Sequence, residues 1–129
     1  MLSNDVFDQV YTLVKSEMLE EYPNLAFSRS IKTESEPSLP CLAVIQIDSV
    51  EKGKTLDGSN MNGMQSVFQI ESYSDESYDE AFEIIGKAGD IMSRLGYELK
   101  TQKEVSTNVW RFVARFQRVI GANELPISL

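Results

Sequence analysis

The chain contains no histidine and only one cysteine, Cys41, among its 129 residues. Without histidine it cannot build a Ser-His-Asp triad, a Cys-His pair, an HExxH zinc site or a Cys/His finger. The single cysteine excludes an internal disulfide and is compatible with a reducing cytosol. Catalysis would have to rest on carboxylates, lysine or tyrosine, and no motif of that kind stands out. We therefore expect a protein that is not an enzyme and holds no cofactor.

Long apolar runs and an excess of positive charge are missing as well. No run approaches the roughly 18 apolar residues of a membrane-spanning helix, and the first residues lack the basic start and apolar core of a signal peptide. We therefore expect synthesis in the cytoplasm and no membrane partner. Twelve Lys and Arg against 20 Asp and Glu give a formal net charge of −8. This charge argues against binding to nucleic acid phosphates, which needs a basic patch.

What is present indicates one folded domain over residues 1–129. Hydrophobic residues make up 42% of the chain and charged residues 25%, values that are typical of a folded domain with a core. Apolar residues recur at helical spacing from Asp5 to Glu21, and again from about Ser77 to Leu95, where Ser77 and Glu80 have capping-box spacing and Gly96 is a stop signal. Strands are expected at 25–33, 41–47, 64–74, 97–103 and 108–120.

This order of elements, α-β-β-β-α-β-β, predicts an α+β fold. We expect a mainly antiparallel mixed sheet with the two helices on one face. The strand Leu25–Thr33 alternates between apolar and polar residues, which is typical of a strand near a sheet edge. The strand Cys41–Ile47 is apolar on both faces and should be central. On the second helix, Tyr78 and Phe82 should belong to the buried stripe, while Gly86 and Gly89 should allow close packing of helix on sheet.

The hairpin between the second and third strands has an unusually long connection, at about residues 50–63. It contains three glycines and an Asp-Gly turn signal. Hairpins normally close with roughly 2–5 residues, and longer loops are usually functional or disordered. We therefore expect this loop to be flexible and make it the first candidate for function.

The last strand has two contrasting faces. Trp110, Phe112 and Phe116 share one face, whereas Arg111, Val113 and Arg115 share the other. If the helices cover the aromatic face, the opposite face meets solvent, and the same argument leaves Leu42, Val44 and Val67 without cover. Aliphatic residues interspersed with arginine fit a subunit interface, since arginine pairs bidentately with carboxylates. The alternative is a solvated face with scattered valines.

Other candidate sites are less well supported by the sequence. Asp75, Ser77 and Asp79 have the spacing of a calcium loop, but glycine and glutamate are missing from the positions that such a loop requires, which favours an ordinary acidic helix start. Tyr73, Tyr78 and Tyr97 could frame a small-molecule pocket, although aromatic residues at the ends of elements usually lie at the edge of a core.

The layout resembles the tail terminator, or tail completion, proteins of long-tailed bacteriophages and prophage tail modules. The resemblance lies in the N-terminal amphipathic helix and the strand Pro40-Cys41-Leu42-Ala43-Val44-Ile45-Gln46-Ile47. It continues through the long polar hairpin loop, the strand Val67-Phe68-Gln69-Ile70-Glu71-Ser72-Tyr73-Ser74 and the sequence Leu95-Gly96-Tyr97. It ends with the closing strand Trp110-Arg111-Phe112-Val113-Ala114-Arg115-Phe116.

The resemblance implies a structural protein of the virion tail. Such proteins form a hexameric ring that caps the tail tube at its head-proximal end, stops tube polymerisation and offers the surface to which the head attaches. The implied partners are further copies of the chain, the tail tube protein and a head-side connector protein, with assembly in the host cytoplasm. DNA would pass through the lumen without specific binding, and a wall with negative charge would repel it.

The resemblance also suggests which side chains make contacts. In the long loop these are Lys52, Lys54, Leu56, Asp57 and Met61. In the last strand they are Arg111 and Arg115, placed at subunit contacts and paired with acids such as Glu71. Two alternatives remain: a phage neck or head-completion protein, and a small-ligand-binding α+β module.

Overall fold

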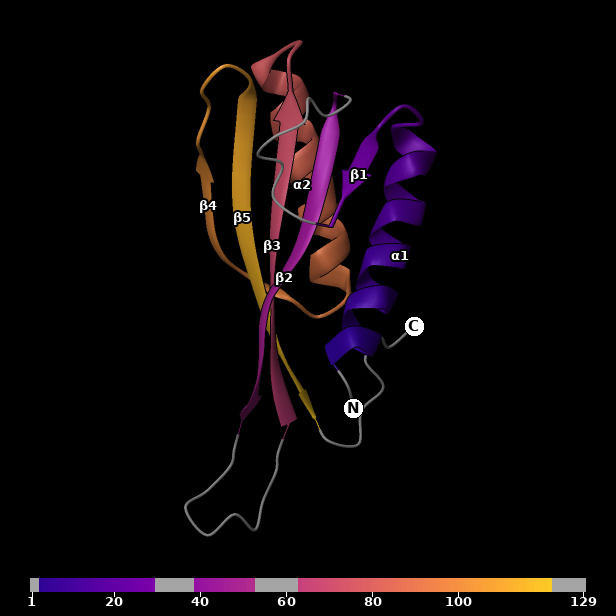
Figure 1. Ribbon diagram of the computed structural model, residues 1–129, viewed down its shortest axis with the longest axis vertical. Helices are drawn as coiled ribbons and strands as arrows, with labels where there is room; N and C mark the ends of the chain where they lie inside the picture. The colour runs from indigo at the N-terminus through magenta and orange to yellow at the C-terminus, as the bar shows by residue number, and fades with distance from the viewer. Residues whose placement is uncertain (1–2, 30–38, 53–62, 122–129) are drawn as a thin grey trace, which may run out of the picture.

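The chain folds into a layer of helices packed on a layer of strands (Figure 1). The computed structural model describes residues 3–29, 39–52 and 63–121. Its elements in chain order are α1 (Ser3–Glu21), β1 (Ala26–Ser28), β2 (Cys41–Lys52), β3 (Gly63–Ser74), α2 (Tyr78–Arg94), β4 (Glu98–Glu104) and β5 (Trp110–Gly121). The α+β order predicted from the sequence is confirmed.

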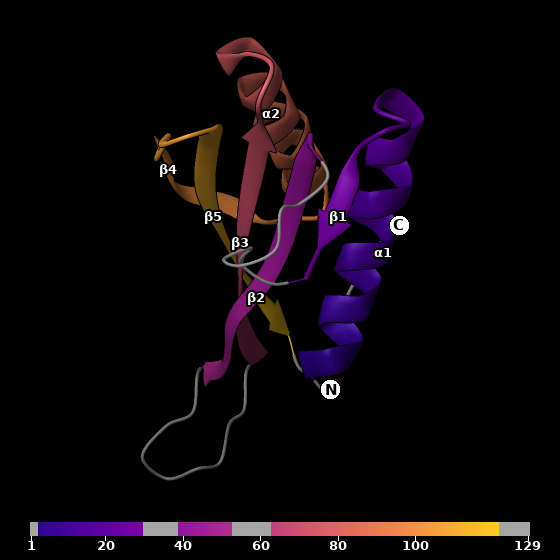
Figure 2. The same cartoon turned by 45° about the horizontal axis from the view of Figure 1, so that its top comes forward.

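The five strands form one mixed sheet in the order β1-β2-β3-β5-β4. β1 runs parallel to β2, and the other neighbouring pairs are antiparallel. Both helices pack on the same face of the sheet, as predicted (Figure 2). We call the opposite face, which carries Glu71, Arg111 and Arg115, the open face.

The core lies between the two layers and fixes which side of each strand is buried. α1 inserts Val6, Val10, Val14 and Met18, spaced at one residue per helical turn, and α2 inserts a second set of aliphatic residues. They pack against Phe68, Ile70, Phe112, Ala114 and Phe116 of β3 and β5. Each fully buried large side chain stabilises the fold by about 1.5–3 kcal/mol. Burial of Phe112 and Phe116 therefore directs Arg111 and Arg115 to the open face.

The ends of α2 follow the signals in the sequence. Ser77 is the N-cap, and its hydroxyl accepts a hydrogen bond of 3.0 Å from the backbone N–H of Glu80. The carboxylate of Glu80 accepts a hydrogen bond from the hydroxyl of Ser74, which ties the helix start to the end of β3. After the helix, Gly96 has a φ of +89°, the left-handed conformation that favours glycine. The predicted N-cap and stop are confirmed, whereas the capping box is only half formed, because the backbone N–H of Ser77 donates to the hydroxyl of Ser74 and not to Glu80.

The strand boundaries differ from the prediction in two places. β1 spans only Ala26–Ser28 of the expected strand at 25–33, although its position at the sheet edge is confirmed; residues 30–33 lie outside the described residues. β2 continues to Lys52, well beyond the expected end at Ile47, through an irregularity between Gln46 and Asp48. Residues 48–52 are mostly polar and are held by backbone pairing with β3, so hydrophobic periodicity could not reveal them.

The long loop is accordingly shorter than predicted. Val50, Glu51, Lys52 and Gly63 belong to paired strands, and the remaining connection, 53–62, lies outside the described residues. The far ends of β2, β3 and β5 extend beyond α2 as a three-stranded ribbon formed by residues 48–52, 63–67 and 117–121 (Figures 1 and 2). We call this segment the ribbon.

The prediction that Leu42 and Val44 lack cover is wrong. Both are fully buried in the core beneath the helices. Cross-strand pairing of Val44 with Ile70 places them on the helix-covered face, while Cys41 and Ala43 face the other way. The segment Cys41–Val44 is apolar at every position, so its sequence holds no alternation from which the orientation could be predicted.

Candidate functional site

The open face carries a continuous group of polar and charged side chains from three neighbouring strands. β3 and β5 pair Tyr73 with Arg111, Glu71 with Val113, and Gln69 with Arg115. On β4, Lys103 pairs with Val113 and Thr101 with Arg115. Directly opposed residues of antiparallel strands project to the same face. The fold therefore gathers side chains from positions about 40 residues apart in the sequence.

Glu71 is the centre of this group and is fully buried. Its Oε1 accepts hydrogen bonds from Arg111 Nη2 at 2.7 Å and Arg111 Nε at 3.0 Å, and also from the hydroxyl of Tyr73. Its Oε2 accepts a hydrogen bond from the side-chain amide of Gln69. Burial of a carboxylate is costly unless it is paired and hydrogen-bonded. These donors satisfy that requirement within the chain.

Near neutral pH, Tyr73 keeps its hydroxyl proton and Arg111 keeps its positive charge. Burial, together with the hydrogen bond to Glu71 and its charge, raises the pKa of the Tyr73 hydroxyl. Burial acts to lower the pKa of Arg111, but the hydrogen bonds and charge of Glu71 outweigh it and raise that pKa. The Arg111 guanidinium also lies 5.6 Å from the centre of the Tyr73 ring, a cation–π contact. Tyr73 is therefore a hydrogen-bond donor and Arg111 a cation.

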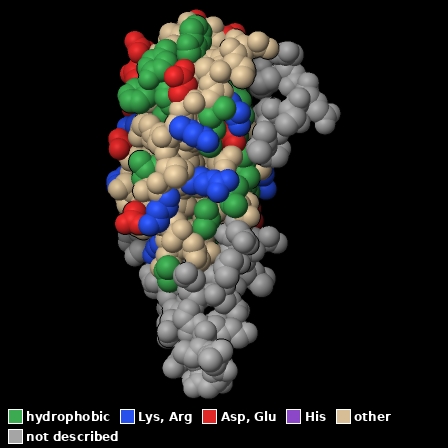
Figure 3. Space-filling model, turned by 90° about the vertical axis from the view of Figure 1, so that its left-hand side faces the viewer, with side chains coloured by type: hydrophobic (Ala, Val, Ile, Leu, Met, Phe, Trp, Pro, Cys, Tyr) green, Lys and Arg blue, Asp and Glu red, His purple; other side chains and the backbone are tan. Residues whose placement is uncertain are grey.

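Arg115 extends the network toward β4. Its Nε donates a hydrogen bond of 2.9 Å to Oε1 of Gln69, whose amide is bound to Glu71. Beside it is a depression of about 530 Å³, which we call the basic hollow, lined by Gln69, Thr101, Lys103, Val105, Arg111, Val113 and Arg115. Figure 3 views the molecule from its β4 side and shows Lys and Arg side chains gathered across the middle of that side. The arrangement is suited to binding an anionic group.

The structure brings together only part of the predicted contact set. Arg111 and Arg115 lie on the open face, as expected. The pairing of Arg111 with Glu71, which we expected between subunits, occurs within one chain. Lys52 is the last residue of β2 and not part of the loop. Lys54, Leu56, Asp57 and Met61 lie outside the described residues. Sequence reasoning missed Lys103, because a basic residue on a polar edge strand has no distinguishing pattern.

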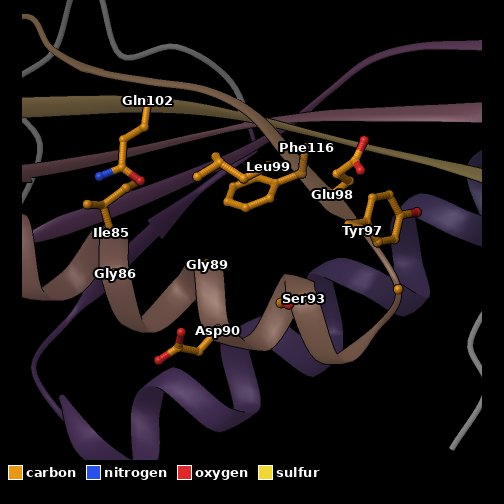
Figure 4. Close-up of a pocket in the computed structure, with 11 residues that line it drawn as sticks. Ile85, Gly86, Gly89, Asp90, Ser93, Tyr97, Glu98, Leu99, Gln102 and Phe116 are labelled. Carbon is orange, nitrogen blue, oxygen red and sulfur yellow. The ribbon is translucent and has the colours of Figure 1, made fainter.

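A second depression, of about 580 Å³, lies on the helix side, between α2 and β4 (Figure 4). Phe116 and Leu99 extend from the strands toward Gly86 and Gly89 of α2. The prediction that Gly86 allows close helix packing is wrong, because a Cβ added there would meet nothing within 4 Å. At Gly89 an added Cβ would lie 3.5 Å from Phe116, an ordinary contact. Packing within the chain therefore does not require either glycine.

The buried stripe of α2 also differs from the prediction. Tyr78 is 44% exposed and Phe82 is 48% exposed, although both rings contact Phe112. Ile84 and Ile91 are buried in their place. The α-helical pattern allowed either stripe, since apolar residues occupy both sides of the first two turns.

The alternative sites predicted from the sequence find no support among the described residues. Tyr73 belongs to the open face, Tyr97 is buried in the helix-side core, and Tyr78 is exposed at the start of α2, so the three do not frame one pocket. Within residues 3–29, 39–52 and 63–121, no group of His, Cys, Asp and Glu side chains could hold a metal ion. In the same part of the chain, neither helix has the length and apolar character needed to cross a membrane.

Comparisons with known proteins add no family to this description. The sequence matches no protein-family model and no curated protein.

Proposed function

We propose that this protein is a structural component of a phage-type tail, a terminator that forms a hexameric ring at the head-proximal end of the tail tube. The resemblance in sequence layout supports this role. The observation that carries it is the open face, where a buried carboxylate organises Arg111 and Tyr73 while Arg115 and Lys103 stay exposed. Such a surface is suited to contact with another protein.

The composition and rigidity of this surface support an interface over a solvated face. Arginine and tyrosine are enriched at protein interfaces, and charged groups that are already held in place lose less conformational entropy on binding. Val105 and Val113 line the basic hollow between the charged groups and are only half-buried. These aliphatic side chains would be removed from water by a partner, which stabilises a complex by about 25 cal/mol per Å² of apolar surface.

The ribbon gives the proposed ring a second contact surface. It extends beyond α2, and its three strands are joined by backbone pairing. Lys52 at the end of β2, with Lys54, Leu56, Asp57 and Met61 in the connection that follows, would contact the tail tube protein or the head-side connector protein. DNA would pass through the lumen without being retained, consistent with the net charge of −8.

The test is a tail-assembly system from which the gene for this chain has been removed. Without the chain, we expect tails of uneven length that fail to join heads. The wild-type chain should restore uniform tails, whereas a chain in which residues 53–62 are replaced by a short Gly-Ser connection should fold and yet fail to restore them. Uniform, head-joined tails in the absence of the chain would contradict the proposal. Rescue of head joining alone, with tail length already uniform, would indicate a neck or head-completion protein.

A further inference from the structure

The basic hollow is positively charged in a chain whose net charge is strongly negative. Lys103, Arg111 and Arg115 line it, and the one carboxylate beneath them, Glu71, is paired with Arg111. Lys103 and Arg115 form no ion pair with any described residue. The hollow therefore presents two cations whose charge is not balanced by a partner in the described part of the chain.

Arg115 is positioned to receive a carboxylate. Its Nε is held by Gln69, which leaves both terminal amino groups of the guanidinium without a partner among the described residues. A carboxylate binds a guanidinium through two parallel N–H···O bonds, and a guanidinium that is already oriented loses little entropy on binding. Thr101 stands opposite Arg115 on β4 and lines the same hollow, adding a hydroxyl group.

A matching line of carboxylates lies on the other side of the molecule. Asp79, Glu83, Gly86 and Asp90 are all exposed and are spaced along α2 at i, i+4, i+7 and i+11, so they share one side of the helix. We call these four residues the acidic ridge. The buried residues of α2 face the sheet, so the ridge lies on the opposite side of the helix, where Gly86 and Asp90 also border the depression between α2 and β4. The three carboxylates are exposed, and none of them forms an ion pair with a cation of the described residues.

Gly86 gives the ridge a feature that the fold of a single chain does not explain. Glycine within a helix is destabilising by about 0.5–1 kcal/mol relative to alanine. A Cβ at Gly86 would meet no atom within 4 Å, so the position tolerates a larger residue in the isolated chain. A bare stretch of helix between acidic residues would let another surface come close to the backbone of α2.

We propose that the basic hollow of one copy of this chain binds the acidic ridge of a second copy. Arg115 and Lys103 contact the ridge carboxylates, and Gly86 lets the backbone of α2 approach β4 and β5. Because the hollow and the ridge lie on opposite sides of the two layers, copies join front to back. Such heterologous contacts build a closed ring or a filament. The number of copies in the ring rests on the proposed function, whereas the contact rests on these two surfaces.

The test uses two charge-reversed variants of the full chain. The hollow variant carries Lys103→Glu and Arg115→Glu, and the ridge variant carries Asp79→Lys and Glu83→Lys. All four residues are exposed, so both variants should fold. In sedimentation velocity over a concentration series, each variant alone should associate at least about tenfold more weakly than the wild type, because like charges then face each other.

Mixing the two variants in equal amounts should restore assembly. The hollow variant still has its acidic ridge, which fits the unaltered hollow of the ridge variant, and the two reversed surfaces also complement each other. A control variant with Lys15→Glu and Lys100→Glu makes the same change in net charge outside the hollow, and it should assemble by itself like the wild type.

Three outcomes would overturn the contact: a mixture that stays dissociated, a hollow variant that assembles like the wild type, or a wild type that remains monomeric throughout the series. In each case tail termination by the same variants would show whether the proposed function fails as well. Variants that still produce uniform, head-joined tails would refute the contact and leave the function standing.

Discussion

Replacing Glu71 by glutamine tests whether its buried carboxylate stabilises the open face. Glu71→Gln keeps the shape of the side chain and removes its charge. The carboxylate accepts two hydrogen bonds from Arg111 and one each from Tyr73 and Gln69. The amide has one acceptor oxygen, and its NH₂ group would replace an oxygen that accepts from a buried donor. At least one buried donor is then unsatisfied, and the Arg111 cation loses its counter-ion.

The expected cost follows from the burial of the two partners. Removal of one member of a fully buried ion pair destabilises a protein by about 3–5 kcal/mol. The Glu71 side chain is fully buried, but that of Arg111 is 26% exposed, so water partly screens the remaining charge. We therefore expect Glu71→Gln to lower the free energy of unfolding by about 2–3 kcal/mol. This is a large share of the roughly 5–15 kcal/mol that is typical of a folded domain.

The assay is urea unfolding of four proteins: wild type, Glu71→Gln, Arg111→Met and the double variant. Because the two residues contact each other, the cycle should give a coupling energy of about 1–3 kcal/mol. The double variant has no unpaired charge and should be more stable than the sum of the single changes predicts. Glu104→Gln makes the same chemical change at an exposed position of β4 and should cost less than about 0.5 kcal/mol. A Glu71→Gln variant as stable as that control would refute the account.

The remaining predictions concern local features of the fold. Gly86→Ala should raise the free energy of unfolding by about 0.5–1 kcal/mol in denaturant titration, because the added Cβ has open space; a loss would show that the site is crowded. Ser77→Ala should cost about 1 kcal/mol by removing the N-cap of α2, and an unchanged midpoint would contradict that role. The raised pKa of Tyr73 means that unfolded chains lose this proton first as the pH rises. Stability is therefore fully present below about pH 10 and should fall above it by about 1.4 kcal/mol per pH unit for this group. Tyr73→Phe should flatten that slope, as followed by tyrosine absorbance and unfolding; an unchanged slope would exclude Tyr73 as its source.

The sequence predicted the fold well where burial is one-sided. Val6, Val10, Val14 and Met18 mark one side of α1, and Phe112 and Phe116 mark one face of β5, so periodicity alone determines their orientation. The prediction for Leu42 and Val44 was wrong, because a strand that is apolar at every position does not indicate which of its residues face the helices. Hydrophobic periodicity also missed the end of β2, where backbone pairing in the ribbon replaces burial.

The candidate site was predictable only in part. Arg111 and Arg115 were assigned to the open face from alternation within one strand. Their partners depend on register: Glu71 and Gln69 come from β3, and Lys103 comes from β4. Local sequence does not encode which residues of two strands lie opposite each other, so neither the hydrogen bonds of Glu71 within the chain nor the basic hollow could be predicted. The acidic ridge of α2 likewise required the burial of Ile84 and Ile91 to be known.

The proposed role as a tail terminator can be tested by the position and copy number of this chain on isolated tails. Tails carrying the chain with an affinity tag would be imaged by electron microscopy with a gold-labelled reagent, and the copies counted by quantitative mass spectrometry against the tube protein. We expect six copies, all at the head-proximal end. A chain that is absent from the tails, spread along the tube or bound at the distal end would contradict it.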